Sequence, residues 1–178
     1  MKDFVVYIKL EKYLAQWLTH SLGHPVRFPA QSNENAVLRR FLQKIPEGKQ
    51  PELMFDGATA VVIPDSKAKD PSIYNYLGPR AKEAIIEAIE DLFRRNLWSE
   101  LGDMTDCNIG LNKMIAAWCE MHGIDDDYVE TVRQKYYRIR NAYNKKGVFL
   151  GSLTRKRSDK EDCSEQHRTT PNKYSSYD

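Results

Sequence analysis

The sequence lacks the features of a membrane or exported protein. It has no uninterrupted apolar run near the roughly 20 residues that a membrane-spanning helix needs. Its first apolar stretch, within MKDFVVYIKLEKYLAQ, is too short and too often interrupted by lysine and glutamate for a signal peptide. Only three cysteines occur, and an odd number without a close C-x-x-C pair favours free thiols over a disulfide framework. We therefore expect a cytoplasmic protein that contacts no membrane.

Motifs for nucleotide-dependent or nucleophilic chemistry are also absent. The sequence contains no P-loop, no G-x-G-x-x-G and no G-x-S-x-G. His20 and His24 are four residues apart, but Gly23 would end a helix between them, and no acid or cysteine follows at metal-ligand spacing. The aspartates between 56 and 70 stand next to glycine or proline, as turn residues do. We expect a protein that is not an enzyme and that uses no cofactor and no metal.

The charge is nearly balanced overall but unevenly distributed along the chain. Lysine and arginine together number 27 and the acids 25, which gives a formal net charge of +2. The segment from Arg133 to Arg157 holds nine lysines and arginines and no acid, whereas residues 83–130 are mainly acidic. A localised basic surface attracts phosphates even on a nearly neutral protein. This asymmetry is the main functional signal in the sequence.

The patterning predicts an α+β fold that begins with a small α+β domain at 1–66. Short β-branched runs predict three strands, at 4–10, 52–55 and 59–64, the last two joined by a turn at Asp56-Gly57. Apolar residues at helical spacing predict two helices, at 11–23 and 32–45, the second capped by Ser32 or Asn33.

The rest of the chain is predicted to be mainly helical. The polar segment 64–72, bounded by prolines, predicts a linker or surface loop. A helical domain at 71–150 follows, with helices at 72–77, 79–102, 108–124 and 126–147. Residues 151–178 contain almost no aliphatic side chains and cannot bury enough surface to fold, so we expect a disordered, flexible basic and polar tail.

The segment WCEMHGIDDDYVETV, at 118–132, has the spacing of a helix-turn-helix. Gly123 can provide the turn, and Cys119 is small enough for a close contact between two helices. Apolar residues stand on both sides of this turn: Trp118, Ile124, Val129 and Val132. Over residues 80–147 the sequence therefore resembles the helix-turn-helix superfamily of DNA-binding domains, through its spacing pattern and without matching any specific family.

An acidic run departs from that resemblance. Asp125, Asp126, Asp127 and Glu130 lie at the start of the second helix, the end that usually enters the major groove. Acids there repel phosphates, and carboxylates read bases mainly by accepting a hydrogen bond from cytosine. Acids at a helix N-terminus also cap the helix and complement its dipole, without any DNA. The sequence leaves open whether this run excludes docking in the major groove.

The basic part of the last helix lies further along the chain. One apolar stripe is assigned to the core: Val129, Val132, Tyr136, Ile139 and Tyr143. The other faces carry cations, and arginine can fork to two phosphate oxygens. The arm TRKR at 154–157 would extend this surface. A basic helix and a basic arm of this kind can also be exposed to solvent without binding any nucleic acid. The predicted DNA contacts are Arg133, Lys135, Tyr137, Arg138, Arg140, Lys145, Lys146, Arg155, Lys156 and Arg157.

These features predict a non-enzymatic protein that binds double-stranded DNA, as a transcriptional regulator or an accessory factor of a phage or mobile element. RNA is a less favoured target, for which the tyrosines would be stacking platforms. The alternative is a structural or protein-interaction module, such as a phage or assembly component. In that case Tyr13, Trp17 and Phe28 would anchor an interface on the α+β half. Either function is compatible with a homodimer or another protein partner.

Overall fold

The fold consists of a two-stranded antiparallel sheet and five helices, in a computed structural model that describes residues 3–103 and 110–146. In chain order the elements are β1 (Val5–Lys9), α1 (Lys12–Leu22), α2 (Asn33–Phe41), β2 (Ala58–Val62), α3 (Pro79–Asp103), α4 (Leu111–Met121), the 3-10 turn η2 (Asp126–Tyr128) and α5 (Val129–Lys145). The α+β class predicted from the sequence is confirmed.

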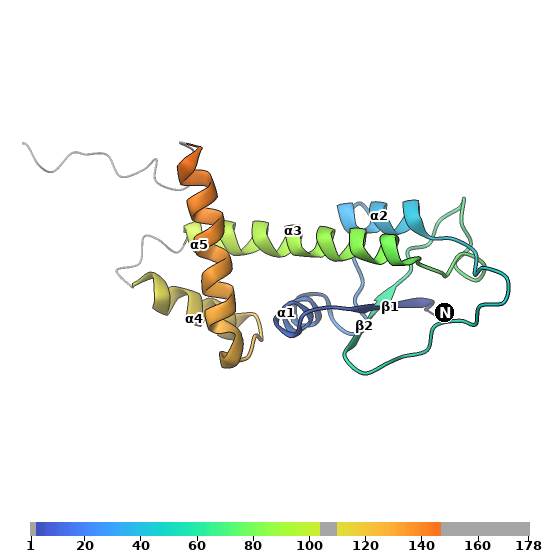
Figure 1. Ribbon diagram of the computed structural model, residues 1–178, viewed down its shortest axis with the longest axis horizontal. Coiled ribbons are helices and arrows are strands. Elements are labelled where there is room, and N and C mark those ends of the chain that lie inside the picture. The colour runs from blue at the N-terminus through green and yellow to red at the C-terminus, as the bar shows by residue number, and fades with distance from the viewer. Residues whose placement is uncertain (1–2, 104–109, 147–178) are drawn as a thin grey trace, which may run out of the picture.

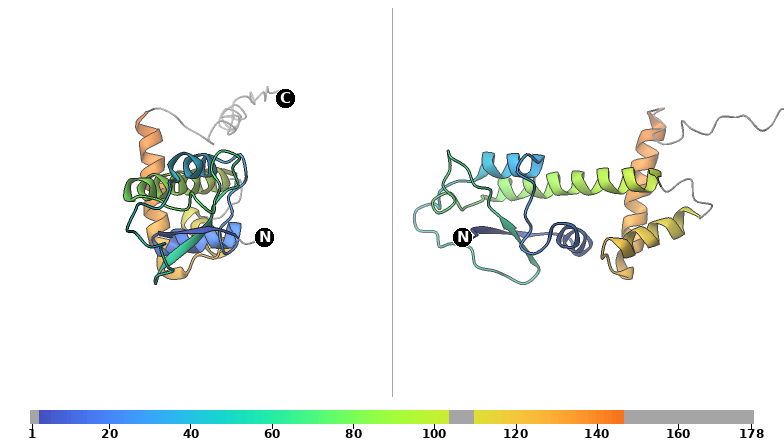
Figure 2. Two further views of the ribbon diagram at one scale, coloured as in Figure 1. Left: turned by 90° about the vertical axis from the view of Figure 1, so that its right-hand side faces the viewer. Right: turned by 180° about the vertical axis from the view of Figure 1, so that it is seen from behind.

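The long helix α3 is the axis of the molecule (Figure 1). The sheet and α1 lie along one side of it, and α2 lies on the opposite side, over its first half (Figures 1 and 2). Helices α4 and α5 are placed at its C-terminal end, where α5 crosses it steeply. The N-terminal and C-terminal halves are therefore both built on one helix.

Side chains spaced four residues apart on α3 form the spine of the core: Ile85, Ile89, Phe93, Leu97 and Leu101. The core cluster around them includes residues from both sides of segment 66–71. The domain boundary predicted there stays a prediction. Tyr13, Trp17 and Phe28 are buried in this cluster, so their assignment as exposed interface anchors was wrong. The helical period of α1 placed two of them on its inner face.

The sheet is assembled from strands that are distant in the sequence. Val6 of β1 stands opposite Val61 of β2, and Val26 bridges the other edge of β2. The predicted strand at 52–55 is wrong, because Leu53 and Met54 are 82% and 67% exposed and lie in a loop. Both edges of β2 are already occupied, so this segment cannot form the predicted hairpin with β2.

Two helix predictions fail for a related reason. Helix α2 ends at Phe41 and not near 45, because Lys69 Nζ donates to the carbonyls of Arg39, Arg40 and Leu42 at 2.7–3.1 Å. Gln43 then pairs with Tyr76 in an antiparallel bridge, which holds 72–77 out of a helix. Contacts between distant segments override the local preference in both places.

Other local predictions are confirmed. Ser32 caps α2 by accepting a hydrogen bond from the Asn35 backbone at 3.2 Å. Gly23, with φ of 79°, ends α1, and Pro79 begins α3. No helix in the two described ranges is long and apolar enough to cross a bilayer. The tail predicted at 151–178, which contains Cys163, lies outside the described residues, and so does Cys107.

Gly123, between α4 and η2, is predicted to be intolerant of a side chain. Its φ is +66°, and an added Cβ would lie 2.7 Å from Cδ2 of His20 on α1. We expect Gly123→Ala to lower the free energy of unfolding by about 1 to 3 kcal/mol in urea denaturation. Gly48→Ala is the matched control, because Gly48 has φ of +78° and open space around it. Equal losses in the two variants would show that the contact with His20 contributes nothing.

Candidate nucleic-acid interface

Helices α4 and α5 pack together across a short turn at Gly123, where the sequence predicted a helix-turn-helix-like pair. The turn is closed by the Ile124 backbone N–H, which donates to the carbonyl of Cys119 at 2.9 Å. Trp118, Cys119, Ile124 and Val132 are buried, as expected, whereas Val129 is only partly buried. Burial raises the pKa of the Cys119 thiol to about 11, so the group stays protonated at neutral pH and packs as a small apolar side chain.

A polar network fixes α4 against α3. The carboxylate of Glu100 accepts hydrogen bonds from Asn96 at 2.5 Å and from the Trp118 indole at 2.8 Å, and it lies 2.7 Å from Nε2 of His122. The amide oxygen of Asn96 in turn faces the indole N–H of Trp17 on α1, at 3.3 Å. The network therefore joins three helices, and through α4 it determines where α5 begins.

The N-terminal end of α5 lies beside α1. The Asp125 backbone N–H donates to Gln16 Oε1 at 3.2 Å, and the amide of Gln16 donates back to the Asp125 carboxylate. Asp126 and Asp127 stay exposed at the same end. In the usual docking of a helix-turn-helix this end enters the major groove. Here both α1 and the acids stand beside it, which disfavours that mode.

Three of the predicted DNA contacts are engaged within the protein. Arg133 forms an ion pair with Glu130 at 2.5 Å, and this carboxylate raises the pKa of the arginine. Lys135 points back to α1, with Nζ 5.1 Å from the ring centroid of Tyr13. The hydroxyl of Tyr137 faces Asn112 of α4 at 3.4 Å. These side chains are not free ligands for phosphate.

Four other predicted contacts stay free. Arg138, Arg140, Lys145 and Lys146 are exposed, and none has an ion pair in the described part of the chain. We call these four residues the α5 cation cluster. At 3.6 residues per turn, Arg138 and Lys145 lie on the face opposite the core, and the other two lie on opposite flanks. Arg155, Lys156 and Arg157 lie outside the described residues.

A groove of about 570 Å³ lies between α3 and the C-terminal half of α5, and it was not predicted from the sequence. Trp98, Ile139 and Tyr143 line it, together with Arg94, Arg95 and Lys146. No motif marks these α3 residues, because the groove forms only when α5 crosses α3.

The two arginines of this groove are paired with acids. Arg94 binds Glu90 at 2.5 Å and Asp91 at 2.7 Å, in pairs that their spacing along the helix favours. Arg95 lies 3.7 Å from the buried carboxylate of Glu34. The groove therefore adds little uncompensated positive charge to the α5 cation cluster.

Comparisons with known proteins give no independent assignment. No protein-family model, no curated protein and no solved structure matches the chain. Within residues 3–103 and 110–146, no three histidine, cysteine, aspartate or glutamate side chains gather as metal ligands would. The functional interpretation therefore depends on the geometry of α5.

Glu100 is expected to stabilise the fold only above its pKa. Burial alone would raise this pKa, but hydrogen bonds from His122, Asn96 and Trp118 lower it below the usual 4.5. The stabilisation is thus fully present above about pH 4.5 and is lost as the pH falls through the lowered pKa. We expect Glu100→Gln to have a lower free energy of unfolding than the wild type at pH 7, measured by urea titration. The difference in free energy between the two proteins should become smaller below about pH 4.5.

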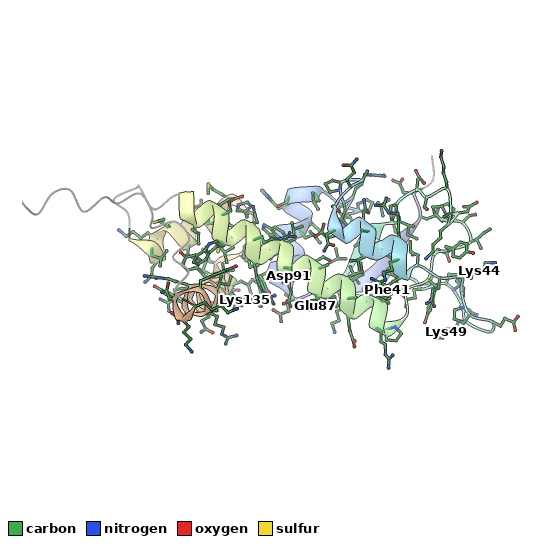
Figure 3. All side chains as sticks on the ribbon, turned by 90° about the horizontal axis from the view of Figure 1, so that it is seen from above. Phe41, Lys44, Lys49, Glu87, Asp91 and Lys135 are labelled. Atoms are coloured by element: carbon green, nitrogen blue, oxygen red, sulfur yellow. The ribbon has the colours of Figure 1, made fainter. Side chains whose placement is uncertain are left out.

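Glu87→Gln is the control for that experiment. Glu87 is exposed on the same helix and makes no ion pair within the described ranges (Figure 3). Its substitution removes the same charge without touching the network, so stability should change little at either pH. If the free energy of unfolding of the wild type and of Glu100→Gln changed with pH in the same way, the role assigned to the carboxylate would be contradicted.

Proposed function

We propose that this chain is a non-enzymatic protein that binds double-stranded DNA through its phosphates, with the α5 cation cluster as the contact surface. The observation that carries the proposal is the arrangement of Arg138, Arg140, Lys145 and Lys146 along the C-terminal half of α5. They lie on its outer face and both flanks, without ion pairs in the described part of the chain. A role as a transcriptional regulator or as an accessory factor of a phage or mobile element belongs to the same proposal.

The flanking positions matter because a duplex presents two rows of phosphates. The major groove is about 12 Å wide and admits a helix, so cations on the two flanks can reach the two strands. Arg140 and Lys146 have these positions, with Arg138 between them on the outer face. Each phosphate that is neutralised releases counterions from the DNA, which supplies affinity without sequence readout. The basic arm at Arg155, Lys156 and Arg157 would add further phosphate contacts and so increase this affinity.

The tyrosines support a duplex over a single strand as the target. Rings that bind single-stranded RNA need a free face on which a base can stack. Tyr136 and Tyr143 instead pack on Trp98 of α3, with centroids 5.5 and 5.3 Å away. Tyr137 contacts Tyr136 edge-on at 6.1 Å. Their rings already serve to hold α5 in place.

Removing three of the four cluster residues should weaken DNA binding and reduce its dependence on salt. We expect Arg138→Ala/Arg140→Ala/Lys145→Ala to bind a labelled mixed-sequence duplex more weakly in fluorescence anisotropy. The slope of log K against log salt should become shallower by about 2 to 3, because each phosphate contact contributes about 0.9. An unlabelled single strand should compete less well than the duplex. Binding that is unaffected in the variant, or absent in the wild type at low salt, would contradict the proposal.

The matched control removes the same charge at the far end of the molecule. Lys44, Lys67 and Arg80 are exposed, and Lys44 and the start of α3 lie far from α5 (Figures 1 and 3). Replacing these three residues by alanine should leave the salt slope within about 0.5 of the wild type. A loss equal to that of the cluster variant would mean that net charge alone drives binding.

Among the cations predicted from the sequence, some have a partner within the protein and others are exposed without one. Arg133→Ala and Lys135→Ala should each weaken DNA binding less than Arg138→Ala, because Glu130 and Tyr13 already engage these two cations. The same anisotropy series, run on the three single variants after checking the fold by circular dichroism, measures this order. Equal losses for all three would extend the contact surface into the N-terminal half of α5.

A further inference from the structure

The outer edge of β1 is an unpaired sheet edge. The carbonyl of Phe4 accepts from the Ile63 backbone at 2.8 Å, so Phe4, Val6 and Ile8 direct their backbone groups toward β2. Alternate residues of a strand direct these groups to opposite sides. The N–H and C=O groups of Val5 and Tyr7 therefore point away from β2, as do those of Lys9, and they have no hydrogen-bond partner within the described residues.

The opposite edge of the sheet is closed. Val26 donates from its backbone N–H to the carbonyl of Ala60 at 2.8 Å and accepts from the N–H of Val62 at 2.9 Å. These two bonds also confirm the alternation, because Ala60 and Val62 face away from β1. A two-stranded sheet is only marginally stable alone, and an open edge is a template for a further strand.

We infer that two copies of this chain pair through β1, antiparallel and about a two-fold axis at Tyr7. Three residues point outward, and Tyr7 is the middle one, so the edge is complementary to itself. Tyr7 stands opposite Tyr7 of the second copy, and Val5 stands opposite Lys9. Each of these facing pairs exchanges two backbone hydrogen bonds. The result is one four-stranded antiparallel sheet that runs through both copies.

The side chains near this edge fit a second copy better than an unrelated peptide. Lysine on an edge strand often prevents pairing, but here Lys9 would stand opposite Val5 and diagonal to Asp3 of the second copy, whose carboxylate also pairs with Arg27 of its own chain at 2.8 Å. Phe4 and Phe55, each 40% exposed, precede the two strands at opposite ends of the sheet. The two-fold axis brings opposite ends of β1 together, so the exposed Phe4 of each copy lies at one end of the junction, near the end of β1 of the other copy. The pairing needs no nucleic acid and does not depend on the proposed function.

Disulfide trapping tests both the edge and its register. The full chain is used with Cys107→Ser and Cys163→Ser, which leaves the buried Cys119. Facing residues of a hydrogen-bonded pair have Cα atoms about 5.5 Å apart, within the range of a disulfide. We expect Tyr7→Cys to form a disulfide-linked dimer under mild oxidation.

Lys9→Cys is the matched control. In this register the two Lys9 residues are separated by four positions along the strands, roughly 14 Å, which is too far for a disulfide. A mixture of Val5→Cys and Lys9→Cys chains should form the mixed dimer, because these positions face each other. Cross-linking of Lys9→Cys alone as readily as Tyr7→Cys would overturn the register.

Light scattering of the unmodified chain without DNA should give twice the 20.7 kDa of one copy. Tyr7→Pro should shift it to a monomer without unfolding it, since the N–H that proline removes has no partner within the monomer. If Tyr7→Pro unfolds, as circular dichroism would show, the cysteine variants decide. A chain that stays monomeric up to millimolar concentration, or a dimer that forms no Tyr7→Cys disulfide, would overturn the inference.

Discussion

The packing of three aromatic rings around Phe93 is the contact on which the rest of the structure depends. Tyr13 and Trp17 of α1 and Trp118 of α4 all meet the Phe93 ring edge-on, with centroids 5.2–5.7 Å away. Edge-on pairs contribute about 0.5–1.5 kcal/mol each beyond the area they bury. Because Phe93 stands midway along α3, this one side chain places the first helix of the chain beside the helix-turn-helix-like pair. Without it, α1 and the α4–α5 pair would be joined mainly through α3 and through polar contacts such as that between Gln16 and Asp125.

That placement decides which end of α5 is free. Gly123 must pack on His20 without a side chain, and Gln16 binds Asp125 at the first turn, so α1 occupies one side of the start of α5. In the C-terminal half of α5, Trp98 packs on Tyr136 and Tyr143, and the cations between and beyond these two tyrosines reach solvent. A surface on the outer end of α5 is therefore a consequence of aromatic packing at its inner end. Apolar contacts determine where α5 lies, and the basic residues are side chains on its exposed surface.

The local part of this arrangement could be predicted from the sequence, and the non-local part could not. The cap at Ser32, the turn at Gly123 and the buried face of α3 each follow from a few neighbouring residues, and the structure has them. The strand expected at 52–55 failed because Val26, far away in the sequence, already occupies the free edge of β2. In the candidate interface, the basic residues were found by composition alone. Their division into free and engaged cations depends on partners in α1 and α4 that no periodicity reveals.

The charge pattern of α5 has two causes that can be separated by position. Acids at the start of a helix and cations in its last turn complement the dipole, and that effect fades within one turn of the end. Asp126, Glu130, Lys145 and Lys146 need no further explanation. Arg138 and Arg140 both lie more than one turn before the end of the helix at Lys145, where the dipole gives no advantage, and they have no acidic partner in the described part of the chain. Unpaired arginines there favour an external anion, so these two residues carry more of the case for phosphate binding than the lysines beyond them.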